Sequence, residues 1–166
     1  MFHENFKDTY AALNGEARLF GASTKIESEN EVILKELSPL CMGEKKDAIV
    51  SIRFLPMTDM EKEKIEKAFG NVYEEKEDTY LVEVTAENVT VYSNYERGFL
   101  YGACTVWTHY KDGIKEGLIY NVPLVQFRAV KMYLPAEEKL DEFYYMVDMF
   151  MHYGYNALIL EVGGAM

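Results

Sequence analysis

The chain has 166 residues, of which 49% are hydrophobic and 14% aromatic, and this composition supports a packed core and excludes a disordered protein. The formal net charge of −11 argues against nucleic acid and anionic membranes as partners, because phosphate binding needs clustered lysine and arginine. The two cysteines, Cys41 and Cys104, are too few for a disulfide framework. An acidic, solvated surface accounts for the charge.

No targeting segment is apparent at the start of the chain. The N-terminus, MFHENFKD, lacks the basic start and apolar run of a signal peptide. No stretch approaches the roughly 18 apolar residues that a membrane span needs. The sequence therefore predicts a cytoplasmic protein, with secretion left open.

The first part of the chain is predicted to contain one helix and two short strands. Apolar residues recur at helical spacing over residues 1–14, and Asn14-Gly15 ends the pattern well. The residues that form this stripe are Phe2, Phe6, Tyr10 and Leu13. Within residues 16–37, the segments GASTKIESE and EVILKEL are extended in character and are predicted to be strands.

Residues 48–93 have a clearer pattern of strand, helix and hairpin. The segment AIVSIRFL is rich in β-branched residues and ends at Pro56, which predicts a strand over 48–55. Thr58 or Asp59 can cap a helix over 60–69, with Gly70 as its stop. Alternation then predicts two strands, at 80–85 and 88–93, joined by a tight turn.

Residues 95–111 are predicted to be a helix in spite of two glycines. Gly98 and Gly102 are four residues apart and share one helical face. Each costs about 1 kcal/mol against alanine in a helix, so close approach to a sheet would explain them. The element order after residue 48 predicts an open sheet of about four strands with packed helices, a small α/β sandwich.

The last part of the chain predicts a second unit. Residues 117–127 read as an extended crossover, and Pro123 excludes a central strand position there. A strand at 129–133, a helix at 136–152 and a strand at 157–162 follow, which is one βαβ unit. Two buried parallel strands need further strands beside them. We therefore expect two domains, 1–124 and 125–166, with the second truncated inside a larger protein.

Three segments resemble glycoside hydrolase family 20, the β-N-acetylhexosaminidase family. The first resembles the end of that family's non-catalytic α/β domain, with its "Y-x-L-x-V" strand and "G-x-x-Y-G-x-x-T" helix. The matching residues are Tyr80, Val82, Val84, Gly98, Tyr101, Gly102 and Thr105. The second, VPLVQFRAVKMYL, resembles the linker and "R-G" first barrel strand, with Arg128 and Ala129 in place. The third, YGYNALILEV, resembles the second barrel strand, which Asn156 precedes.

The resemblance covers about half of the chain and implies a fold and an activity. The fold would be an α/β accessory domain followed by the first strand–helix–strand of a (β/α)₈ (TIM) barrel. The activity would be hydrolysis of O-glycosyl bonds in carbohydrate metabolism by substrate-assisted chemistry, in which an Asp-Glu pair orients the 2-acetamido group and supplies the acid. That pair belongs to the fourth strand, so no catalytic residue is expected in this chain and the fragment should be structural and inactive.

The chain also departs from the family pattern. The family's sugar-binding arginine after the first strand has no counterpart in YLPAEEK, and its "H-x-H" second strand is replaced by LILEVGGA. The chain is therefore expected to be a divergent relative, and the departures lie at positions that bear on the family's sugar preference. The α-glucuronidases and the O-GlcNAc-hydrolase family, which place a similar α/β domain before a barrel, stay open as alternatives.

Two residues are candidates for sugar binding. Reacting groups of a (β/α)₈ barrel lie at the carboxyl ends of its strands, which here carry Tyr133 and Glu161. Glu161 is the only ionisable residue of its strand, so its carboxylate either holds sugar hydroxyls or pairs with a neighbouring Lys or Arg. Gly163-Gly164 would let a loop run close to a ligand or simply turn the chain.

Other conspicuous side chains have simpler explanations. The acidic run 137–142 opens a helix, where negative charge is favourable and solvated. The helical stripe of Leu140, Tyr144, Val147 and Met151 is expected to cover the barrel strands. The three histidines, His3, His109 and His152, lack zinc-site spacing. No metal site and no cofactor are expected.

Three functional hypotheses follow. In the first, the parent protein is a glycoside hydrolase and binds a carbohydrate substrate. The second is a non-catalytic carbohydrate-binding or protein-interaction module, and the third is a catalytically dead barrel kept as a scaffold. In every case strands 129–133 and 157–162 would leave apolar faces uncovered, so the fragment is expected to dimerise through them or leave them disordered.

Overall fold

A computed structural model describes residues 7–41, 49–109 and 112–163 of the chain, with side chains from residue 9 onward. These residues form two compact units. One runs from Asp8 to Pro123, and the other contains the residues from Leu124 onward. Each is described by itself.

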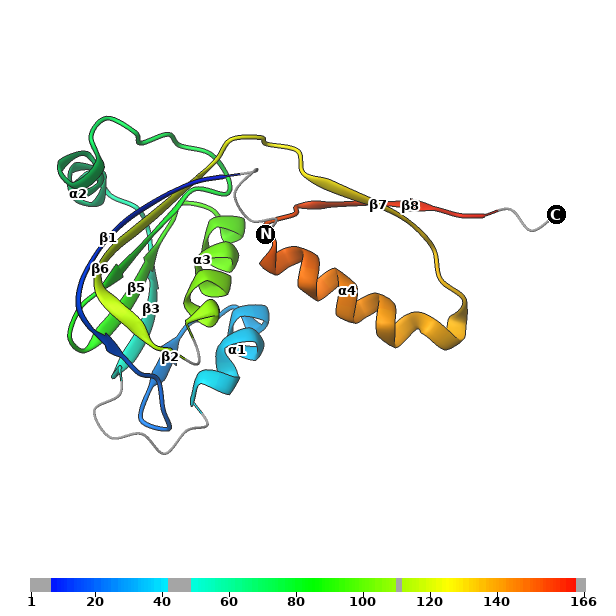
Figure 1. Ribbon diagram of the computed structural model, residues 1–166, viewed down its shortest axis with the longest axis horizontal. Coiled ribbons are helices and arrows are strands. Elements are labelled where there is room, and N and C mark those ends of the chain that lie inside the picture. The colour runs from blue at the N-terminus through cyan, green and yellow to red at the C-terminus, as the bar shows by residue number, and fades with distance from the viewer. Residues whose placement is uncertain (1–6, 42–48, 110–111, 164–166) are drawn as a thin grey trace. The chain divides into compact units, whose positions relative to one another are not determined.

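The first unit is built on a six-stranded mixed sheet with the strand order β1-β6-β4-β5-β3-β2, drawn in Figure 1. Its strands are β1 (Lys7–Arg18), β2 (Lys25–Glu27), β3 (Ser51–Leu55), β4 (Tyr80–Val84), β5 (Asn88–Tyr92) and β6 (Ile114–Pro123). The hairpin β4–β5 is antiparallel, whereas β3 runs parallel to both β5 and β2. The predicted α/β class is confirmed, and the sheet is larger than the four strands expected from the sequence.

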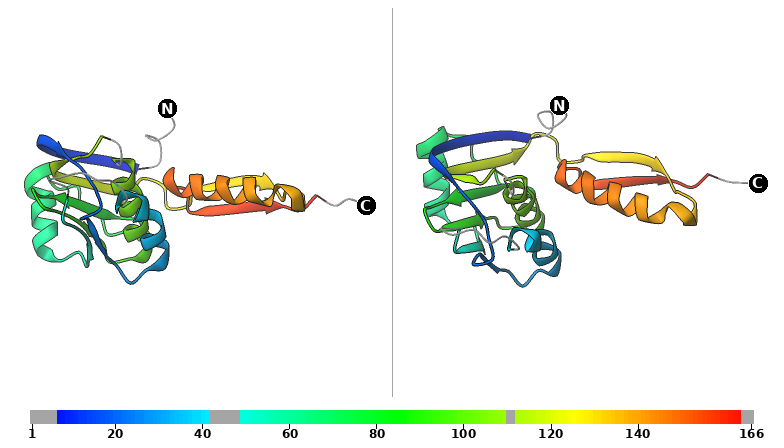
Figure 2. Two further views of the ribbon diagram at one scale, coloured as in Figure 1. Left: turned by 90° about the horizontal axis from the view of Figure 1, so that it is seen from below. Right: turned by 60° about the horizontal axis from the view of Figure 1, so that its bottom comes forward.

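Helices cover both faces of this sheet. The helices α1 (Glu31–Leu37) and α3 (Glu96–Thr108) lie on one face and α2 (Asp59–Phe69) on the other, as Figures 1 and 2 show. The predicted helix at 60–69 is confirmed, with Thr58 as its cap in a capping box with Glu61. Beneath α2 lies a core of five buried residues, which are Met57, Ile65, Leu81, Tyr120 and Val122.

The two glycines of α3 lie where the helix meets the sheet. A Cβ on Gly102 would overlap the Cγ1 atom of Val91 on β5, and one on Gly98 would lie 2.6 Å from the carbonyl oxygen of Thr79. Real Cβ atoms do not approach that closely, because atoms repel each other steeply inside their van der Waals distance. The sequence-based reason for these glycines, close approach to a sheet, is therefore confirmed.

The prediction of a helix over residues 1–14 is wrong for its described part, because Lys7–Arg18 is the edge strand β1. A spacing of four is even, so Tyr10 and the residues four and eight before it fit one face of a strand as well as a helix. The segment forms a strand because β1 pairs with β6. The ring of Tyr10 also packs near those of Phe69 and Tyr120, at centroid distances of 5.8 and 5.9 Å. Phe2 and Phe6 lie outside the described residues.

The prediction of a strand at EVILKEL is also wrong, since these residues form α1. The side chain of Asn30 caps the helix by accepting hydrogen bonds from the backbone N–H groups of Val32 and Ile33. The seven-residue helix buries Ile33 and Leu37, which are four apart, and α1 packs against α3. A segment this short carries too little periodicity to separate helix from strand.

Pro123 does not keep its segment out of the sheet interior. The strand β6 lies between β1 and β4, so the expectation of a non-central crossover is wrong. The proline is the last residue of the strand and lies beyond Asn121, where the pairing with β4 ends. The cost of a missing N–H depends on position along a strand, which the sequence did not reveal.

The second unit is a βαβ unit with the elements expected from the sequence. The strands β7 (Ala129–Tyr133) and β8 (Ala157–Glu161) are parallel, with Ala129 opposite Ala157 and Tyr133 opposite Glu161. The short 3₁₀ helix η2 (Glu137–Lys139) precedes α4 (Leu140–His152). Of the predicted packing stripe of α4, Leu140, Val147 and Met151 are half-buried. Tyr144 is exposed instead, and its neighbour Phe143 is buried.

Candidate functional site

The two candidate residues lie side by side at the carboxyl ends of β7 and β8. Tyr133 and Glu161 are direct partners in the parallel register, so their side chains leave the same face of the strand pair. The backbone continues the contact, since the N–H of Leu134 donates to the carbonyl oxygen of Glu161 at 3.0 Å. The structure thus brings together a phenol and a carboxylate that are 28 residues apart in sequence.

A third polar residue, Lys131, joins them. Its ammonium lies 2.6 Å from the Oε2 atom of Glu161. Because strand side chains alternate, Lys131 and Tyr133 share a face. Sequence reasoning left open a pairing of Glu161 with a cation from a neighbouring loop, and the cation instead comes from the adjacent strand. The signal that could have identified it is the position of Lys131, two residues before Tyr133 on an otherwise apolar strand.

The two faces of this strand pair differ in polarity. The alternate positions Val130 and Met132 are half-buried, whereas Lys131 and Tyr133 are exposed. We infer that α4 packs on the face of Val130 and Met132, because a helix of this unit is what can bury them. The opposite face, called here the open face, carries Lys131, Tyr133, Ile159 and Glu161.

The amino ends of the same strands are held by Arg128 and Asn156. The Arg128 side chain is buried and donates to the carbonyl oxygens of Val125 and Gly154, both at 2.6 Å. The Asn156 Oδ1 atom accepts from the N–H of Arg128 at 2.9 Å, and its Nδ2 donates to the carbonyl of Gln126 at 2.6 Å. These two residues carry part of the family resemblance, and in this structure they fix the chain at the strand ends opposite Tyr133 and Glu161.

A separate cluster of charges ties α2 to the sheet. The Lys64 ammonium lies 2.9 Å from both carboxylate oxygens of Glu83, and the Tyr92 hydroxyl donates to Glu83 at 3.1 Å. Burial, with the charge of Glu83 next, raises the pKa of Tyr92 to about 12. Because every charged member is paired within the cluster, we assign it a structural role.

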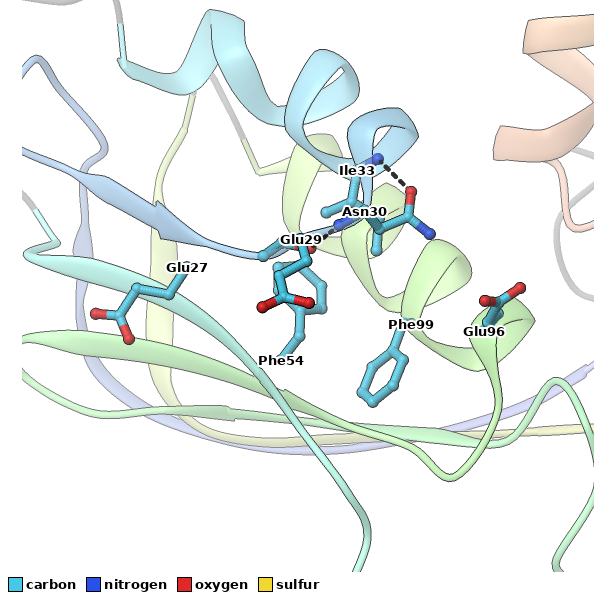
Figure 3. A pocket seen from close by; sticks show the side chains of 8 residues that line it. Glu27, Glu29, Asn30, Ile33, Phe54, Glu96 and Phe99 are labelled. Atoms are coloured by element: carbon cyan, nitrogen blue, oxygen red, sulfur yellow. Dashed lines mark hydrogen bonds between the residues drawn. The ribbon is translucent and has the colours of Figure 1, made fainter.

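A cavity of about 590 Å³ lies at the amino ends of α1 and α3, as Figure 3 shows. Its apolar part is formed by Phe54 and Phe99, whose rings meet edge to face with centroids 6.0 Å apart. Its polar rim includes the exposed residues Glu29 and Glu96. The amide oxygen of Asn30 is already used to cap α1, so the cavity offers no buried polar group to a ligand from that residue.

The remaining sequence candidates show no chemistry of their own. The acidic side chains at the start of η2 and α4 are exposed, as at Glu137 and Asp141. Across residues 7–41, 49–109 and 112–163, no group of three His, Cys, Asp or Glu side chains is arranged to hold a metal ion. In the same part of the chain, no helix has the length and apolarity to span a bilayer. Gly163 is exposed, and Gly164 lies outside the described residues.

Comparison with known proteins gives a fold and no family. No family model matches the chain and no curated protein matches it. Among solved structures, the chain is similar to a glycoside hydrolase family 20 β-N-acetylglucosaminidase, with a TM-score of 0.64 and 16% identity over 96% of this chain and 30% of that one. It is also similar to the family 20 β-N-acetylhexosaminidase from Streptomyces coelicolor A3(2), with a TM-score of 0.60 and 16% identity over 90% of this chain and 32% of that one.

A third similar structure is CpGH84B, with a TM-score of 0.61 and 18% identity over 95% of this chain and 29% of that one. The chain thus spans about a third of the length of these relatives. Identities this low establish a shared fold only, because one fold can serve many functions. What the comparisons show is a chain with the fold of part of a glycoside hydrolase, similar to the family 20 β-hexosaminidases.

Proposed function

We propose that this chain is the front part of a glycoside hydrolase related to family 20, and that the parent protein cleaves O-glycosyl bonds. In this proposal residues 1–124 form an accessory α/β domain, and residues 125–166 begin a (β/α)₈ catalytic barrel. The similar fold of family 20 structures supports it, as does the order of the three resembling segments. A cytoplasmic location remains part of the proposal.

The observation that carries the proposal is the arrangement of β7, α4 and β8. Two parallel strands with a helix on one face and an open second face match one repeat of a barrel, whose interior is filled by side chains from further strands. Ile159 on the open face is exposed. A lone pair of strands with apolar side chains in water is unfavourable, and further strands would bury them.

Within this proposal, Glu161 and Tyr133 bind the sugar. Ligands of (β/α)₈ enzymes bind at the carboxyl ends of the strands, which is where these two residues lie opposite each other. The catalytic acid pair implied by the resemblance would lie on a later strand, outside this chain. We therefore expect the 166-residue chain to be inactive by itself and to pair with a second copy through β7 and β8.

The test is hydrolysis of a panel of aryl glycosides by the full-length protein, with the 166-residue chain as control. Release from an N-acetyl-β-hexosaminide by the full-length protein alone is the expected result. Release from a different sugar would keep the hydrolase and discard the N-acetylhexosaminide specificity. Absence of release from every glycoside would contradict the proposal and favour a binding module or an inactive barrel scaffold.

A further inference from the structure

The open face of the second unit contains an ion pair that stability does not explain. The Lys131 side chain is 64% exposed and that of Glu161 is 43% exposed. Ion pairs this open to water contribute little to folding, because solvent screens the charges and two long side chains lose freedom. The other positions facing the same way, apart from Tyr133, are Ala129, Ala157 and Ile159. Lys131 and Glu161 therefore supply the charges of a face whose remaining β7 and β8 side chains, apart from Tyr133, are apolar.

Around this pair the open face presents complementary hydrogen-bonding groups. The Lys131 ammonium offers two further N–H donors after meeting Glu161 Oε2, and Glu161 Oε1 remains an acceptor. The Tyr133 hydroxyl can both donate and accept a hydrogen bond, and this residue is 68% exposed. A sugar has the matching properties, since neighbouring hydroxyls both donate and accept and the ring C–H groups pack on an aromatic face.

The net charge of the pair decides which sugars it fits. A lone ammonium would favour a sugar carboxylate, and a lone carboxylate would favour a sugar ammonium. At 2.6 Å each charge is compensated by the other, so neither kind of charged sugar gains by binding there. A neutral glycoside can instead bridge the pair through two hydroxyls without leaving either charge unpaired.

We propose that Lys131 and Glu161 act as a neutral donor–acceptor couple that selects uncharged glycosides over anionic ones. This inference rests on the proposed function, because it takes the open face as the sugar site. Lys131 binds the sugar in this view and also orients the Glu161 carboxylate. Removing one partner should therefore change the charge preference of the site as well as its affinity.

The experiment measures binding to the full-length protein by calorimetry, separately from hydrolysis. The probes are the methyl β-glycosides of N-acetylglucosamine, glucose and galactose, each compared with its counterpart carrying a carboxylate at C6. The unchanged protein is expected to prefer the neutral member of whichever pair it binds. Glu161→Gln leaves an unpaired ammonium and should shift the neutral-to-anionic affinity ratio toward the uronate by at least about tenfold.

Matched variants separate this effect from simple loss of structure. Lys131→Met should weaken the binding of the neutral probes by about tenfold or more. It should not increase the affinity for the uronate. Lys131→Arg retains the pair and should keep the original ratio. Glu116→Gln removes a carboxylate of the same type, which pairs with Arg18 at 3.0 Å in the six-stranded unit, and should leave the ratio unchanged.

The outcomes distinguish this inference from the proposed function. An unchanged ratio in folded Glu161→Gln protein, or binding of no probe, would overturn the role of the couple even if glycosides are hydrolysed. A shifted ratio in a protein that hydrolyses no glycoside would support the couple and contradict the hydrolase.

Discussion

The contact between Gly102 of α3 and Val91 of β5 allows a quantitative test of how the first unit packs. Gly102→Ala would place a methyl group on the Cγ1 atom of Val91. Overpacking of this kind costs about 1–3 kcal/mol, and a β-branched valine in a strand has little freedom to move away. The better helix propensity of alanine returns about 1 kcal/mol. Because the overlap is severe, we expect a net loss of about 1–2 kcal/mol in the free energy of unfolding.

The partner substitution should reverse this cost. Val91 is fully buried, so Val91→Ala alone should cost about 2–3 kcal/mol through lost burial and a cavity. In the double variant the methyl group introduced at position 102 occupies the space that Cγ1 leaves. The clash disappears and the helix propensity gain remains, so the double variant should be as stable as Val91→Ala or more so. The coupling energy should be about 2 kcal/mol in favour of the double variant.

The coupling energy can be measured by urea unfolding of the 166-residue chain, with the fluorescence of Trp107 as the signal. This is the single tryptophan of the chain and belongs to α3, so it reports on the first unit. Val89→Ala is the control, because Val89 is equally buried on β5 and is not among the nearest neighbours of Gly102. Additivity within about 0.5 kcal/mol for the pair with Val91 would refute the packing described here.

Three further predictions concern other parts of the chain. Asn156→Ala should lower the protection of the β7 and β8 amides from hydrogen exchange by about 1–3 kcal/mol, because the N–H of Arg128 loses its acceptor. Asn156→Asp keeps an acceptor and should lose less protection, so equal losses in the two variants would contradict this reasoning. Burial raises the pKa of Tyr92 from 10.0 to about 12, so stability should be intact below pH 10 and fall as the pH rises toward 12; Tyr92→Phe should remove that part of the decline. Burial lowers the pKa of His109 below 6.5, so stability should be intact above pH 6.5 and decrease as the pH falls through the folded pKa. If His109→Gln leaves the dependence of stability on acidic pH unaltered, this contribution is excluded.

Patterns along the sequence predicted the elements whose signals are local. The helix after Thr58 has its cap, charged face and glycine stop within one short segment, and the β4–β5 hairpin alternates around a tight turn. The glycines of α3 also indicated a close contact, because glycine in a helix has a cost that packing must justify. Glu161 and Tyr133 were predicted as candidates because strand ends in a βαβ pattern define one edge, and the structure places them opposite each other.

Contacts distant in sequence decided the rest. The even spacing of apolar residues before Tyr10 fits both helix and strand, and pairing of β1 with β6 selected the strand. The segment EVILKEL became a helix because Asn30 caps it and its apolar side packs on α3. The position of Lys131, 2.6 Å from Glu161, followed only from the parallel register of β7 and β8. The sequence by itself determined local propensity and polarity, whereas partner choice depended on which segments, far apart in the chain, could bury surface and satisfy hydrogen bonds together.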